Sequence, residues 1–119
     1  FIAVNDVIDA ESLEVYRKLY DSFVDGTIDC KTHRWDLGNF QPRSQQQSEN
    51  VCQIMWPSDF VKGLSDGPLH RRTNELARIL LGDDVNFDFD MLIYKAPHTN
   101  TEVPWHQDEG YWPDVPDKR

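Results

Sequence analysis

An alternation of apolar and other side chains between Val85 and Lys95 is the clearest pattern in the chain. Every second position is apolar over this stretch: Val85, Phe87, Phe89, Met91 and Ile93. A period of two is typical of a strand with one buried face, because successive side chains point to opposite sides of a sheet. The pattern therefore predicts a strand over 85–95, with these five side chains on its inner face.

Two other segments carry apolar residues at helical spacing. The first follows Asp9, a good N-cap residue, and stops at Gly26, a favourable C′ residue. Its apolar stripe comprises Leu13, Tyr16, Tyr20 and Phe23. The second starts at Gly67 and Pro68 and stops at Gly82, an arrangement that places Pro at the first helical position. Its stripe comprises Leu69, Thr73, Leu76 and Leu80. The spacing predicts two amphipathic helices.

Shorter apolar runs predict further strands at 1–8 and 51–56, and we expect another strand over 105–112, after the loop 98–104. Ser58 is expected to cap a short helical turn over 59–64. The polar stretch 36–50 has no periodicity and predicts a long surface loop. Helices come early in the chain and strands accumulate late, an order that favours an α+β or mainly β fold over alternating βαβ units.

The composition indicates one small soluble domain. The chain has 119 residues, of which 39% are hydrophobic and 12% aromatic, enough for one core but not for two. Its net charge of −9 argues against nucleic acids and anionic membranes as partners, because both require clustered Lys and Arg. No apolar run approaches the roughly 20 residues that span a bilayer, and no secretory signal is recognisable. We therefore expect a cytoplasmic protein in which Cys30 and Cys52 stay reduced.

Acidic residues gather in the last third of the chain. Residues 83–119 contain nine acidic and three basic side chains, which form either a solvated face or a group of carboxylates that converge on a cation. His106 and Asp108 are two positions apart, and on a strand such residues point to the same side. They could occupy two corners of the 2-His-1-carboxylate triad of non-haem Fe(II) oxygenases. A surface histidine beside a surface aspartate would have the same spacing.

The run from Met91 to Trp112 contains Tyr-Lys-Ala-Pro and then Trp-His-Gln-Asp-Glu-Gly-Tyr-Trp. It resembles the signature of the phytanoyl-CoA dioxygenase family, and the preceding helices and polar loop extend the resemblance over most of the chain. The resemblance implies an α+β or mainly β fold with part of a double-stranded β-helix, a cupin-like jelly roll, flanked by N-terminal helices. It also implies Fe(II)- and 2-oxoglutarate-dependent hydroxylation of a small organic or acyl substrate by O₂.

Matched position by position, the resemblance makes His106 and Asp108 iron ligands and places Met91 at the 2-oxoglutarate site. Halogenating relatives replace the carboxylate with a small residue, so Asp108 favours a hydroxylase. Three aromatic residues lie beside the ligands in the sequence, where they form either a substrate wall or part of the core: Trp105, Tyr111 and Trp112.

The second iron histidine and the arginine that binds 2-oxoglutarate in the family have no match here, since His33, His70 and His98 stand in other contexts. Some relatives also carry a lysine near the position of Val51, and none is present. We therefore expect residues 1–119 to be the N-terminal fragment of a single dioxygenase domain. The alternative is a non-catalytic jelly-roll binding module in which His106 and Asp108 hold a structural or adventitious cation.

Overall fold

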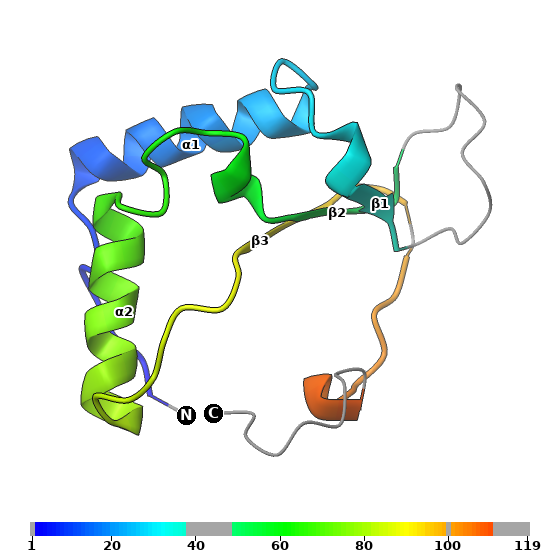
Figure 1. Cartoon of the computed structure of the whole chain (residues 1–119). Helices are drawn as coiled ribbons and strands as arrows, with labels where there is room; N and C mark the ends of the chain where they lie inside the picture. The colour runs from blue at the N-terminus through cyan, green and yellow to red at the C-terminus, as the bar shows by residue number, and fades with distance from the viewer. Residues whose placement is uncertain (1, 38–48, 100, 111–119) are drawn as a thin grey trace.

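The computed structural model describes residues 2–37, 49–99 and 101–110. This part of the chain contains the helices α1 (Ala10–Val24) and α2 (Pro68–Leu81) and an antiparallel sheet of three strands (Figure 1). The strands are β1 (Arg34–Asp36), β2 (Val51–Met55) and β3 (Met91–Lys95), in the order β1–β2–β3. The described residues also form three short 3₁₀ turns: η1 (Lys31–His33) before β1, η2 (Pro57–Asp59) after β2 and η3 (Asp108–Gly110) after β3. The fold is α+β; the sheet is open, and the expected jelly roll is not seen in the described residues.

Both predicted helices are confirmed, and their ends follow local chemistry. The Asp9 carboxylate accepts a hydrogen bond from the Ser12 amide at 2.7 Å, and this bond lowers the pKa of Asp9. Gly26, just past the end of α1, adopts φ 84°, a conformation that glycine tolerates best. Helix α2 has Pro at its first position and Gly82 at its C-cap. No helix in the described part of the chain is long and apolar enough to cross a membrane.

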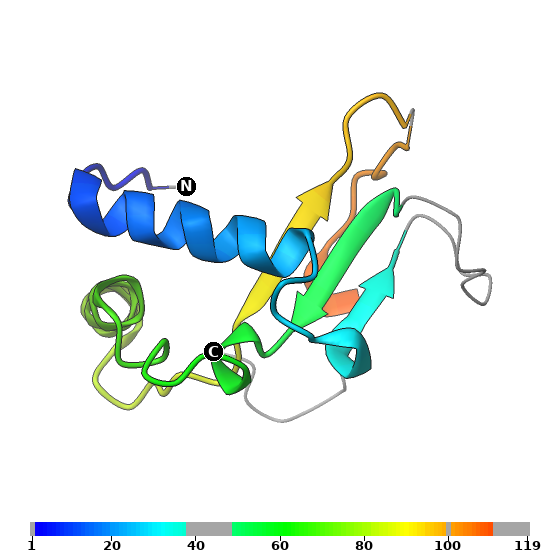
Figure 2. The ribbon, with the colours of Figure 1, turned by 90° about the horizontal axis from the view of Figure 1, so that it is seen from above.

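Helix α1 packs against one face of the sheet and forms the core with it (Figure 2). The fully buried side chains come from α1, from the segment before η1 and from β2: Phe23, Cys30, Cys52 and Ile54. Leu92 and Tyr94 of β3 pack against this cluster. The register pairs Leu92 with Ile54 and Tyr94 with Cys52, so the even-numbered residues of β2 and β3 face α1.

The prediction for 85–95 is confirmed only in part, because Met91–Lys95 forms a strand and 85–90 do not. The odd-numbered side chains of β3 share one face, as the alternation predicts, and this face points away from α1. Met91 and Ile93 are 43% and 49% exposed. The alternation does not show which face packs against α1, because Leu92 and Tyr94 are apolar as well and offer the helix an equally good surface.

Other predicted elements differ from the structure. Residues 2–8 form no strand, and 105–110 contain the turn η3 instead of a strand. The predicted helical turn over 59–64 is displaced to η2, while Val51–Met55 confirms the strand before it. The central part of the predicted loop, 38–48, lies outside the described residues, as do 111 and 112.

Ser58 does not cap a helix but binds the Asp90 carboxylate. The Ser58 hydroxyl donates to one Asp90 oxygen at 3.0 Å, and His70 Nε2 lies 3.0 Å from the other. The backbone carbonyl of Asp90 also accepts a hydrogen bond from Trp56 N at 2.9 Å. Asp90, the residue that precedes β3, thus links the start of this strand to η2 and α2.

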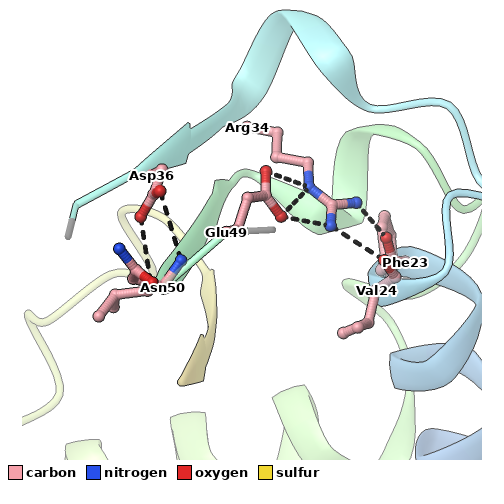
Figure 3. Close-up of polar contacts among 7 residues, drawn as sticks. Phe23, Val24, Arg34, Asp36, Glu49 and Asn50 are labelled. Carbon is pink, nitrogen blue, oxygen red and sulfur yellow. Dashed lines mark hydrogen bonds and ion pairs between the residues drawn. The ribbon is translucent and has the colours of Figure 1, made fainter. Parts of the chain in front are cut away.

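A buried ion pair ties the end of α1 to the sheet (Figure 3). The Arg34 guanidinium donates to the Glu49 carboxylate at distances down to 2.6 Å and to the carbonyls of Phe23 and Val24 at 2.7 and 2.9 Å. The Arg34 and Glu49 side chains are 11% and 8% exposed. The hydrogen bonds with Glu49 raise the pKa of Arg34, which therefore remains charged. The guanidinium closes the last turn of α1, whose carbonyls have no partner within the helix.

Arg34→Met should lower the free energy of unfolding by about 3–5 kcal/mol, because it leaves the buried Glu49 charge and two carbonyls without their partner. The matched control is Arg72→Met on α2. Arg72 forms an ion pair with Glu75, and the two side chains are 44% and 64% exposed. That variant should cost less than about 1 kcal/mol. Urea denaturation of the intact protein measures the free energy of unfolding of both variants. Equal losses of stability would contradict a stabilising role for the buried ion pair of Arg34 and Glu49.

Both cysteines are free and buried in the core. Burial raises the pKa of the Cys52 thiol to about 12. Because the thiolate is the reactive form, Cys52 in the folded protein should react with iodoacetamide at pH 8 roughly a thousandfold more slowly than in urea. Mass spectrometry of the labelled peptide measures the ratio. Similar rates in both conditions would show that Cys52 is accessible and ionised in the native state.

Candidate metal centre

The segment after β3 carries the predicted iron ligands. It turns at Ala96–Thr99, where His98 adopts φ 62°, and then runs to η3. Figure 1 shows α1 on one side of the sheet and η3 on the other. His106 and Asp108 therefore lie on the side that α1 leaves uncovered, the same side toward which Met91 points from β3.

The His106 ring has a fixed orientation and a fixed proton. Its Nδ1 atom lies 2.7 Å from the carbonyl oxygen of Pro104, a group that can only accept a hydrogen bond. Nδ1 must therefore carry hydrogen, and in the neutral ring the lone pair is on Nε2. That atom lies 3.3 Å from Oδ1 of Asp108. A lone pair and a carboxylate oxygen at this distance repel each other unless a proton or a metal cation lies between them.

The same geometry fits a metal ion. Two ligand atoms at about 2.1 Å from a metal and at a right angle to each other are about 3 Å apart. The separation of Nε2 and Oδ1, 3.3 Å, is close to this value. Metal-binding histidines usually donate their second N–H to a carbonyl or carboxylate, as His106 donates to Pro104. The pair thus fits two adjacent coordination positions.

The described residues supply two donors to this centre and no third. No group of three or more His, Cys, Asp or Glu side chains that could hold a metal occurs in the described ranges. His70 is bonded to Asp90, and the His33 ring makes edge contacts with Trp35, Trp56 and Phe60 at 5.2–6.4 Å. The His106 and Asp108 side chains are 39% and 72% exposed and accessible to a ligand.

Of the three aromatic residues predicted to form a substrate wall, only Trp105 lies within the described residues. Trp105 is fully exposed, so it takes no part in the core of the described chain. Tyr111 and Trp112, the other two predicted substrate-wall residues, lie outside the described residues. Met91 lies on the uncovered sheet face beside Gln53, whose side-chain nitrogen contacts both its sulfur and that of Met55. Gln53 was not predicted as a residue of this face, and its only signal in the sequence is a single amide within the apolar run 51–56.

A cavity of about 470 Å³ lies between α1, α2 and the start of β3. Its wall is mostly apolar, and His70 and Asp90, which are bonded to each other, contribute polar groups to it. The His70 and Asp90 side chains are only 13% and 14% exposed, and Asp90 also accepts a hydrogen bond from Ser58. The His106 and Asp108 side chains, on the opposite side of the sheet, are more accessible to a ligand, at 39% and 72% exposed.

Comparison with protein families gives a match over the whole chain. The family model for phytanoyl-CoA dioxygenase (PhyH) matches residues 1–119. Comparison with curated proteins and with solved structures finds no significant match. The family match covers both helices, the sheet and the segment with His106 and Asp108. The chain therefore belongs to the phytanoyl-CoA dioxygenase family.

Proposed function

We propose that the protein is an Fe(II)- and 2-oxoglutarate-dependent dioxygenase that hydroxylates a small organic or acyl substrate with O₂. The observation that carries the proposal is the His106 and Asp108 pair. Nε2 and Oδ1 lie 3.3 Å apart, while Nδ1 is committed to the Pro104 carbonyl. Family membership supports the same chemistry. We further propose that residues 1–119 are the N-terminal part of one catalytic domain with a jelly-roll fold.

In this proposal the chain's own residues bind and orient the reactants. His106 and Asp108 hold iron through Nε2 and a carboxylate oxygen, and the hydrogen bond to Pro104 keeps the imidazole in the correct tautomer. Bound iron, together with 2-oxoglutarate, supplies the activation of O₂ that hydroxylation requires. Met91 contributes an apolar wall to the 2-oxoglutarate site. Trp105, Tyr111 and Trp112 contribute to the substrate site.

The second candidate is a non-catalytic binding module in which the same pair holds a structural or adventitious cation. The exposure of Asp108, 72%, and the presence of only two donors among the described residues favour this alternative. The two candidates differ in one product. An enzyme releases succinate from 2-oxoglutarate in an O₂-dependent reaction, whereas a binding module releases none.

In the full-length protein, His106→Ala and Asp108→Ala should each lower 2-oxoglutarate-dependent succinate release at least about 100-fold, because each removes a direct bond to iron. The matched control is His98→Ala, which removes an exposed histidine from the turn after β3 and should keep activity within about twofold of wild type. Succinate release at the wild-type rate by Asp108→Ala would contradict the assignment.

Residues 1–119 alone should bind iron weakly, since one imidazole and one carboxylate do not complete a facial triad. Anaerobic addition of Fe(II) and 2-oxoglutarate to this polypeptide should give no visible charge-transfer absorption. A visible band at stoichiometric iron would show that the chain contains a third ligand, and that His33, His70 or His98 had been excluded wrongly.

A further inference from the structure

The outer edge of β3, the side that faces away from β2, carries backbone groups that the sheet does not use. The hydrogen bonds just beyond the ends of the strand reveal the pattern. The Asp90 carbonyl accepts from Trp56 N at 2.9 Å. At the other end, Ala96 N donates to the Asn50 carbonyl at 3.0 Å. Because bonded and unbonded positions alternate along an antiparallel pair, the even-numbered residues of β3 bond to β2. The backbone N–H and C=O groups on the outer edge therefore belong to the odd-numbered residues: Met91, Ile93 and Lys95.

These outer groups have almost no partners in the described part of the chain. The Tyr20 hydroxyl of α1 donates to the Ile93 carbonyl at 3.4 Å, which is long for such a bond. No described residue bonds to the three outer N–H groups. An unpaired strand edge is a template for a further strand, and native proteins usually cover or block such edges.

The cavity of about 470 Å³ lies along this edge. Residues 91–93 of β3 form one of its sides, and the other walls come mainly from α1 and α2: Tyr16, Leu19, Tyr20, Leu69 and Thr73. Figure 2 shows α1 extending past β3, on the side away from β2, with α2 beyond the strand. The two helices thus provide an apolar cover for the space beside β3, and α2 limits this space to one extended strand.

The spacing of the outer groups indicates what occupies this space. The N–H groups of Met91, Ile93 and Lys95 follow each other at intervals of about 7 Å, two residues along a strand. A carboxylate or a phosphate is too small to accept from two of them. An extended polypeptide presents carbonyls and N–H groups at the same interval, so the pattern matches a β-strand. A transient partner would leave the edge exposed to aggregation in its absence, which favours a strand of the same protein.

We propose that a segment of the full-length protein outside residues 1–119 adds to β3 as a fourth strand, between β3 and α2. It accepts from and donates to the outer groups of β3, and its side chains on the α1 side fill the cavity. This inference rests on the proposal that residues 1–119 are part of a larger domain. It does not depend on iron or on turnover.

The test is amide hydrogen exchange of the full-length protein, followed residue by residue by NMR at a concentration at which the protein is monomeric. The matched controls are the amides of Leu92 and Tyr94, which bond to β2 in the same strand. The outer amides of Met91, Ile93 and Lys95 should exchange within about tenfold of these controls, because they too are bonded.

Exchange of the outer amides about a thousandfold faster than Leu92 and Tyr94 would overturn the fourth strand. Protection that disappears on dilution would show that a second copy covers the edge, and would overturn the assignment to the same chain. Succinate release tests the proposed activity separately. Protected outer amides in a protein that releases no succinate would refute the enzyme and leave the fourth strand standing.

Discussion

The packing of α1 against a single face of the sheet is the constraint on which the remaining structure depends. Phe23 of α1 and Ile54 of β2 belong to the same buried cluster. Arg34 of β1 donates a hydrogen bond to the Phe23 carbonyl and so holds the end of the helix to the sheet. Because one helix covers one face, the even-numbered residues of β2 and β3 become core. The odd-numbered residues are left for other contacts. The position of Met91 and Gln53 follows from this division and not from any property of their own.

A second, local constraint gives the candidate centre its chemistry. The carbonyl of Pro104 requires a proton on Nδ1 of His106, and Nε2 then presents its lone pair to Asp108 at 3.3 Å. The arrangement depends on three residues of one short segment, so it does not require the pairing of 105–110 with the sheet. This explains how a ligand-like geometry persists although the predicted strand is absent from that stretch.

The parts of the fold that the sequence predicted are those fixed by neighbouring residues. Asp9 and Gly26 mark the ends of α1, and Pro68 and Gly82 those of α2, because capping depends on a few adjacent backbone groups. The face of β3 that packs against α1 could not be predicted, since both sets of alternating side chains in Met91–Lys95 include large apolar residues. His106 and Asp108 were found from their spacing and from a family resemblance. The contacts of Gln53 depend on the strand register, which the sequence does not display.

We propose that an iron ion binds between His106 and Asp108. The most direct test of this proposal is an anaerobic crystal structure of the full-length protein with Fe(II), with anomalous scattering measured at the iron edge. We expect one iron peak about 2.1 Å from both Nε2 of His106 and a carboxylate oxygen of Asp108, with Nδ1 still bonded to the Pro104 carbonyl. An iron peak at another set of residues, or one bound through Nδ1, would contradict it.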